Sequence, residues 1–336
     1  MFPLTPGHSG EAVRDLQRRL AAAGYLPALG AEAGRYCART RDAVVSFQAA
    51  RGLHSTGTCD EHTWSTLVEA GWRLGDRLLH LHSPNTRGDD VVELQLLLGR
   101  LGFDCGRPDG IFGRRTERAL RELQTNCGLE PDGVCGRRTV ALLHGLARQS
   151  GSGPGLPTIR EVEALRVPRS GLTDLRVVLG QLGGLGSLSR GLAKQLRSRG
   201  AHVVLADEPD PHTHAAMANL FGADVYLGVE PHAEPICTIS YFAIPSFSSI
   251  GGRLLARQIE RAFVNVDLAS PAEVIGMRLP VLRETRMPAV LCALGPVRHV
   301  LDHTPEIGAA LLDAVIAWTG AAAQALVPEP PKASGR

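Results

Sequence analysis

The apolar residues in the first half of the chain recur at helical spacing, and the whole pattern occurs twice. Val13, Leu16 and Leu20 stand at positions i, i+3 and i+7, which predicts a helix with one apolar face. This set recurs 78 residues later: Gly10, Val13, Leu16, Gln17, Leu20, Gly24 and Tyr25 correspond to Gly88, Val91, Leu94, Gln95, Leu98, Gly102 and Phe103. A second set recurs 76 residues later: Gly34, Tyr36, Thr40, Ala43, Phe47, Gln48, Gly52, Leu53, Gly57, Thr63 and Leu67 correspond to Gly110, Phe112, Thr116, Ala119, Leu123, Gln124, Gly128, Leu129, Gly133, Thr139 and Leu143. The pattern predicts two repeats of three short helices, over residues 8–72 and 86–146.

Residues that start and stop helices stand at the expected places in both repeats. Thr40 and Thr116 precede apolar residues and are expected to cap the second helix of each repeat. Gly24 and Gly102 are expected to end the first helix in the left-handed conformation. Turns are expected at Asp109-Gly110 and Asp132-Gly133.

The second half of the chain alternates between predicted strands and predicted helices. Residues 147–172 are expected to form a linker, because residues 149–157 are rich in Gly, Ser and Pro, and a short helix is expected over 159–165. Strands are predicted over residues 175–179, 202–205, 225–229, 236–242 and 289–294, and helices over 188–199, 217–221, 251–263 and 307–318. This alternation predicts an α/β domain with a mostly parallel sheet over residues 173–325.

Composition narrows the classes of protein. The 336 residues are 44% hydrophobic and 21% charged with a net charge of +2, which excludes a disordered chain and gives no basic surface for nucleic acid. We expect no membrane span and no signal peptide, hence a cytoplasmic protein whose seven cysteines are reduced. Cys59 and Cys135 occupy equivalent repeat positions and are expected to be packing residues.

The repeat motif resembles a known family. G-x-x-V-x-x-L-Q-x-x-L-x-x-x-G-Y followed by T-x-x-A-V-x-x-F-Q-x-x-x-G-L is similar to the bacterial peptidoglycan-binding domain of the three-helix type. The Gly, Leu and Gln positions are interpreted as determinants of the fold rather than of a ligand. Glycan-binding grooves usually offer aromatic faces, but the second repeat has no Trp or Tyr, so binding of a muropeptide stays an open expectation.

Residues 173–325 resemble the zinc-dependent N-acetylmuramoyl-L-alanine amidases. The resemblance rests on Ala218-Asn219 with Ala223-Asp224, and on the strand from Pro288 to Gly295. Within that family the chain is most similar to the actinobacterial CwlM-type group, through Trp72–Arg77, Ile159–Glu161 and Leu282–Pro288. The fold class is therefore multidomain: two all-α peptidoglycan-binding-type repeats followed by a zinc-amidase-like α/β domain.

The resemblance implies zinc ligands that this sequence lacks. Its three matching site positions are Gly183, Glu230 and Ala293, where the family has a histidine ligand, a second histidine ligand and the general base. His232 could replace Glu230 by a slip of two residues, although Pro231 is expected to end the strand. The resemblance implies the first histidine ligand in the loop after residue 179 and a carboxylate ligand on or before the next helix. However, no His or Cys occurs from 146 to 201, and no Asp or Glu occurs between 175 and 206. We therefore expect no catalytic residue, no bound metal and no cofactor.

Glu230 is the one charged residue among these positions. We expect its carboxylate either to reach solvent or to pair with a cation, for which Arg283 and Arg286 are the candidates.

Three alternatives remain open from the residues alone. Gly180, Gly184 and Gly186 followed by a strand ending at Asp207 could form an NAD(P) site of the short-chain-dehydrogenase kind, although no tyrosine has the lysine four residues away that such enzymes use. An active amidase is the second alternative. A metal site elsewhere, at His212 with His214 or at His299 with His303, is the third.

The resemblance to the CwlM-type group implies a cytoplasmic regulator of peptidoglycan precursor synthesis that acts by binding. Its implied partners are the enolpyruvyl transferase of the pathway, the lipid II flippase and a phosphopeptide-reading domain. The tail after Gly320 contains Ser334 and no threonine.

Overall fold

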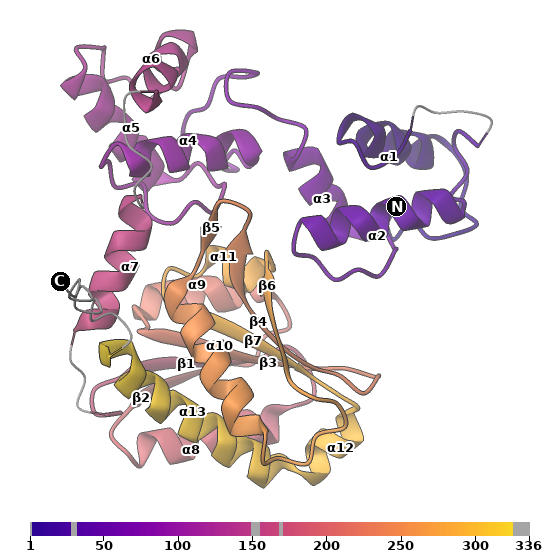
Figure 1. Ribbon diagram of the computed structural model, residues 1–336, viewed down its shortest axis with the longest axis vertical. Helices are drawn as coiled ribbons and strands as arrows, with labels where there is room; N and C mark the ends of the chain where they lie inside the picture. The colour runs from indigo at the N-terminus through magenta and orange to yellow at the C-terminus, as the bar shows by residue number, and fades with distance from the viewer. Residues whose placement is uncertain (1, 28–31, 149–154, 168–170, 325–336) are drawn as a thin grey trace, which may run out of the picture. The chain divides into compact units, whose positions relative to one another are not determined.

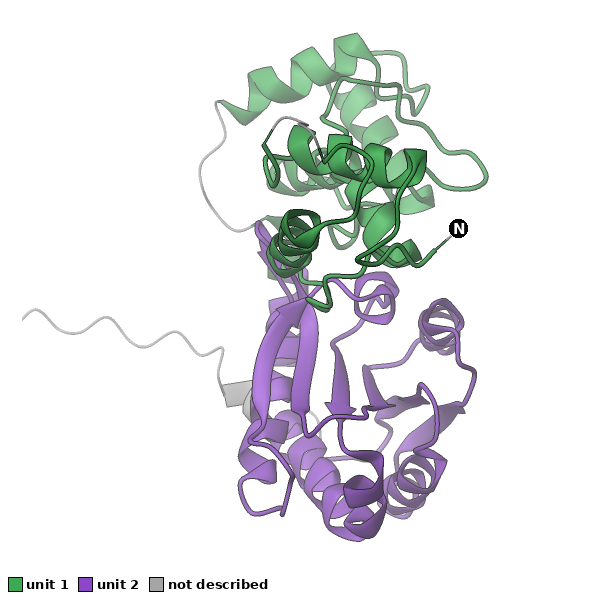
Figure 2. Ribbon diagram, turned by 90° about the vertical axis from the view of Figure 1, so that its right-hand side faces the viewer, with its two compact units in different colours: residues 1–159 green, residues 160–336 purple. Residues whose placement is uncertain are grey.

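The computed structural model describes residues 2–27, 32–148, 155–167 and 171–324. The chain divides into two compact units, Met1–Ile159 and Arg160–Arg336 (Figure 2). Ser334 and residues 149–154 of the predicted linker lie outside the described residues.

The first unit consists of two three-helix repeats, as predicted. Their helices are α1 (Glu11–Ala22), α2 (Ala38–Ala50), α3 (Glu61–Glu69), α4 (Asp89–Arg100), α5 (Arg114–Asn126) and α6 (Arg137–Ala147). Leu16 and Leu94, which correspond in the two repeats, are fully buried in separate apolar cores. Cys59 and Cys135 are buried in the same two cores, and burial raises the pKa of each thiol to about 12.

Two buried glutamines in each repeat hold glycine turns in place. The Nε2 of Gln17 donates to Arg35 O and Thr40 Oγ1, both at 2.9 Å, while its Oε1 accepts from Gly34 N at 2.8 Å. Gly34 has φ +81°, a conformation that favours glycine. Three further pairs repeat this arrangement: Gln48 with Gly57, Gln95 with Gly110, and Gln124 with Gly133. Four amides thus hold four left-handed glycine turns against the helices.

Thr40 and Thr116, which were predicted to cap helices, bond to buried glutamines instead. The N-cap of α2 is Cys37 and that of α5 is Gly113, so the predicted capping role of Thr40 and Thr116 is wrong. Both threonines lie inside the helix, fully buried, and their hydroxyls accept from the amides of Gln17 and Gln95. Each repeat uses its threonine to satisfy a glutamine N–H instead of a helix terminus. Glycine does end α1 and α4 as predicted: Gly24 has φ +82° and Gly102 φ +89°.

The described part of the predicted linker 147–172 contains a helix. Helix α7 (Leu156–Arg166) contains the predicted helical stretch, and Leu165 belongs to the core of the second unit. The carboxylate of Glu161 accepts from Ser249 Oγ at 2.5 Å and from the backbone N–H groups of Ile250 and Gly251 at 3.1 and 3.3 Å. Glu161 therefore caps the N-terminus of α10 (Ile250–Phe263) from a distant segment.

The second unit is built on a mixed sheet. In the described part of the chain its strands are β1 (Arg176–Gln181), β2 (His202–Ala206), β3 (Val225–Pro231), β4 (Cys237–Ile244), β5 (Phe247–Ser248), β6 (Glu273–Met277) and β7 (Ala289–Leu294). Their order is β2-β1-β3-β7-β4-β5, with β6 also paired to β4. Strands β1, β2, β3 and β7 run parallel, as predicted, but β4 runs antiparallel to β7. The predicted strands did not include β5 or β6.

Helices cover both faces of this sheet (Figure 1). One face packs against α8 (Gly186–Arg197), α10 and α13 (Thr304–Gln324), and the other against α9 (Pro211–Phe221) and α11 (Pro280–Glu284). Asn219, part of the amidase-like motif, joins α9 to the segment before β7: its Nδ2 donates to Glu284 O at 2.8 Å and its Oδ1 accepts from Arg286 N at 2.9 Å. Asp224 accepts from Arg176 N at 2.9 Å. Both motif residues therefore position strands of the sheet.

We expect Leu16→Ala and Leu94→Ala each to lower the free energy of unfolding of the first unit by about 2–5 kcal/mol, because each truncation leaves a cavity in a filled core. Gln95→Ala should cost about 1–3 kcal/mol, since it strands the buried N–H of Gly110. Urea unfolding measures these losses, with the exposed Gln195→Ala as the matched control. A loss near zero at both leucines would show that the helix register is wrong.

Candidate functional site

The C-terminal ends of β1, β3 and β7 bring the three predicted site positions to one edge of the sheet. Glu230 in β3 is the register partner of Ala293 in β7. Beyond β1, Leu182 N donates to Val229 O at 3.0 Å, and Gly183 follows at φ +112°. A β-carbon at Gly183 would lie 3.7 Å from Pro231 Cγ.

This edge offers a single ionisable side chain from the three positions, that of Glu230. Gly183 has no side chain, and Ala293 carries a methyl group that is 4% exposed. The Glu230 side chain is half-buried, and its carboxylate has no hydrogen bond or ion pair within the described ranges. Its predicted pairing with Arg283 or Arg286 is therefore wrong, and its partial exposure agrees with the alternative that the carboxylate reaches solvent.

His232 does not complete a ligand set. Strand β3 ends at Pro231, as predicted, and His232 continues into a turn in which its N–H donates to Leu294 O at 2.8 Å. Its Nδ1 accepts from Glu234 N at 3.1 Å, so this nitrogen is engaged within the turn. A catalytic zinc of the amidase kind needs two histidines, a carboxylate and a general base, and the residues at this edge do not fit that set.

A buried neutral pair supports the sheet on the face that carries Glu230. His214 in α9 is fully buried; its Nδ1 lies 2.8 Å from Tyr226 Oη and its Nε2 lies 2.6 Å from Glu208 O. The tyrosine lies over Gly180 and Gly228, where a β-carbon would approach Tyr226 Oη to 2.1 and 2.9 Å. The two glycines therefore make room for the tyrosine ring.

Burial favours the neutral form of the His214 imidazole in the folded protein. Burial lowers its pKa below the ordinary value, although the carbonyl of Glu208 opposes this shift. The imidazole then donates through Nε2 to that carbonyl and accepts the tyrosine hydroxyl at Nδ1. His212 is exposed and its Nδ1 lies 3.1 Å from Glu284 Oε1. His212 and His214, the first candidates for an alternative metal site, therefore bond to different partners.

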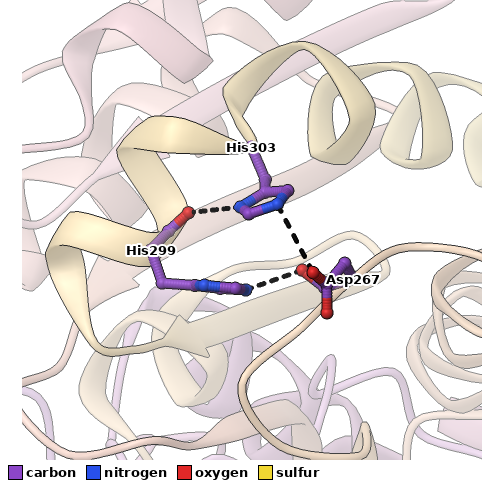
Figure 3. Close-up of side chains that lie close together, drawn as sticks. All are labelled: Asp267, His299 and His303. Carbon is purple, nitrogen blue, oxygen red and sulfur yellow. Dashed lines mark hydrogen bonds and ion pairs between the residues drawn. The ribbon is translucent and has the colours of Figure 1, made fainter.

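The other histidine pair does converge on a carboxylate. Asp267, His299 and His303 form a cluster whose possible ligand atoms all lie within 4.8 Å of one another (Figure 3). It is the one such His, Cys and acidic group found in the described part of the chain. The spacing of the histidines pointed to it, but Asp267 is more than 30 residues away in a loop, and no sequence signal marked it.

Both units are similar to known proteins. The peptidoglycan binding domain family matches residues 9–67 and 87–143, which are the two helical repeats. The amidase CwlM of Mycobacterium tuberculosis is 31% identical over 314 residues, which cover 83% of this chain and 76% of CwlM. The chain belongs to the CwlM family of amidase-like proteins.

Other amidases match parts of this CwlM-family chain. CwlL of Bacillus licheniformis is 32% identical over 147 residues, which cover 38% of this chain and 41% of CwlL. Among solved structures, the amidase AmiC2 of Nostoc punctiforme aligns with a TM-score of 0.36 at 18% identity, covering 45% of this chain and 98% of AmiC2.

The family relationship and the packing both argue against the NAD(P) alternative. The space above Gly180, the first glycine of that motif, is filled by the Tyr226 side chain instead of being open to a pyrophosphate. In the ranges that the structure describes, no helix of this CwlM-family chain has the length and apolar character needed to cross a membrane.

We expect acid to destabilise the second unit through His214. Its folded pKa lies below 6.5, so as the pH falls below about 6.5 the unfolded chain binds a proton that the folded chain does not, and stability is lost by at most about 1.4 kcal/mol per pH unit. Above that pH the contribution is fully present. His214→Gln should flatten the dependence between about pH 7.5 and 5.5.

The fluorescence of Trp318 can report this unfolding, since its side chain is fully buried in the second unit. Replacing Trp64 and Trp72, which lie in the first unit, by Phe leaves Trp318 as the single tryptophan. His212→Gln is the control, because its exposed imidazole pairs only at the surface. An unchanged pH slope in His214→Gln would contradict the assignment of a buried neutral imidazole.

Proposed function

We propose that this protein is a non-catalytic member of the amidase-like family, a cytoplasmic regulator of peptidoglycan precursor synthesis that acts by binding. The observation that carries the proposal is the meeting of Gly183, Glu230 and Ala293 at one sheet edge. Two of the three cannot bind a metal or transfer a proton through a side chain.

The chemistry of hydrolysis supports this proposal. A zinc amidase needs three protein ligands to leave one position for the water, and a carboxylate to take the proton from that water. Glu230 can supply one carboxylate, but Ala293 cannot act as a base and Gly183 cannot act as a ligand. A lone half-exposed carboxylate holds zinc too weakly for the metal to stay in place.

The energetics of burial point the same way. Ala293 is 4% exposed and pairs with Glu230 on one side and Thr238 on the other. A carboxylate at this position without a metal would be desolvated beside another carboxylate, at a cost that would raise its pKa or destabilise the fold. A methyl group removes that cost, as a domain that no longer holds zinc requires.

Binding is the activity that the remaining parts can perform. The two repeats belong to a peptidoglycan binding family, which makes a muropeptide one candidate ligand. The candidate protein partners are the enolpyruvyl transferase of precursor synthesis, the lipid II flippase and a phosphopeptide-reading domain. We place the enolpyruvyl transferase first, since it is a cytoplasmic enzyme.

An active amidase is the second candidate function, because the relatives CwlM and CwlL are both named as N-acetylmuramoyl-L-alanine amidases. The two functions differ in one measurable property, the cleavage of the bond between muramic acid and L-alanine.

We expect the purified full chain to release no peptide from a muramyl peptide, with or without added Zn²⁺. An active zinc amidase assayed in parallel serves as the positive control. Glu230→Gln should behave as the unmodified protein does, because its carboxylate has no catalytic task. Turnover that depends on zinc and is lost in Glu230→Gln would establish the active amidase instead.

The regulatory part of the proposal has its own measurement. The full chain, immobilised, should bind the enolpyruvyl transferase of the same organism and raise or lower its rate. Binding of a muropeptide without any effect on the transferase would favour a muropeptide receptor over a regulator.

A further inference from the structure

The cluster of Asp267, His299 and His303 lies outside the positions at which the amidase family holds its metal. His299 is in α12 (Val297–Asp302), and His303 is the residue that ends this helix. Asp267 lies in the loop between α10 and β6, and neighbouring Leu268 packs with Val300 in the core on the α10 and α13 side of the sheet. Glu230 and Ala293 alternate with the residues of that core and so face the other side.

The hydrogen bonds at the cluster prepare a ring nitrogen for a metal. The Nδ1 of His303 lies 2.9 Å from His299 O, and a neutral imidazole must donate there, because a carbonyl can only accept. The Nε2 of His303 then carries its lone pair and points toward the carboxylate of Asp267, 3.6 Å away (Figure 3). A metal-binding histidine is commonly fixed in this way, with its other nitrogen donating to a backbone carbonyl.

The second histidine is held close to the first. The rings of His299 and His303 lie 4.2 Å apart between centroids, and His299 Nε2 donates to Asp267 O at 2.7 Å, so that the lone pair of this neutral imidazole is on Nδ1. Ligand atoms around a tetrahedral zinc ion are about 3.4 Å apart, as follows from bonds of about 2.0–2.1 Å. Since the atoms here already lie within 4.8 Å of one another, side-chain rotation of these partly exposed groups can close the site.

We propose that Asp267, His299 and His303 bind a divalent transition-metal ion such as Zn²⁺, with water completing its coordination. Two imidazoles and one carboxylate suit Zn²⁺, Co²⁺ or Ni²⁺, whereas Ca²⁺ and Mg²⁺ prefer oxygen ligands alone. The ion would join the loop before β6 to the helix that directly follows β7. This site is independent of the proposed loss of amidase activity, since it uses none of Gly183, Glu230 and Ala293.

Titration of the metal-free full chain with Zn²⁺ at neutral pH tests the proposal. We expect one equivalent to bind, and His299→Ala and Asp267→Asn each to weaken binding by about tenfold or more. Both sites are partly exposed, so circular dichroism should show an unchanged fold. The matched control is His80→Ala with His82→Ala, because these rings also lie close together, 5.2 Å apart between centroids, without belonging to such a cluster.

Cobalt identifies the ligands. Co²⁺ bound at this cluster should show the visible bands of nitrogen and oxygen ligation without thiolate absorption, which separates the site from the cysteines. Absence of a bound equivalent, or equal affinity in the variants, would overturn the proposal. Loss of the metal in Glu230→Gln rather than in His299→Ala would place the ion at the amidase position and overturn the proposed site at Asp267, His299 and His303. If that protein also cleaved a muramyl peptide, the proposed lack of amidase activity would be overturned as well.

Discussion

The parallel register of β1, β3 and β7 is the constraint on which the second unit depends. A slip of one residue in β3 would turn every side chain of the strand to the opposite face and remove Glu230 from its place beside Ala293. The ring of Tyr226 fits only where Gly180 and Gly228 leave room for it. The packing of Tyr226 over Gly180 agrees with this register, and the register decides which residues meet at the sheet edge.

Several polar groups buried in the described parts of both units bond to one another or to the backbone. The first unit buries glutamine amides whose donors and acceptors are matched by a glycine N–H, a carbonyl and a threonine hydroxyl. The second buries an imidazole and a phenol that bond to each other. Asp90, a buried carboxylate, is paired with Arg77 at 2.7 Å. A methyl group at position 293, beside Glu230, leaves no further polar group to be satisfied at this buried position.

Local patterns predicted the helices and the central strands, but not the contacts between distant segments. Spacing of leucines was enough for the repeats, and the structure brings Gly183, Glu230 and Ala293, the positions chosen from the family motif, to one edge of the sheet, with Gly183 in the loop after β1. The role of Thr40 was missed because the partner of its hydroxyl, Gln17, lies on another helix. Asp267 was missed for the same reason: one aspartate in a loop carries no periodic signal, and only the folded chain brings it to His303.

The contacts of Glu161 show that residues before the amidase-like region contribute to the stability of the second unit. Resemblance to amidases starts near residue 173, yet this carboxylate, twelve residues earlier, satisfies Ser249 and two amide groups at the start of α10. A fragment cut at the boundary of resemblance would lose these three hydrogen bonds at the start of α10, where Ser249 would remain as the N-cap, and would expose the apolar surface on which Leu165 packs. The unit that can be transferred as one folded piece therefore starts at or before Glu161 and includes part of the segment that follows the repeats.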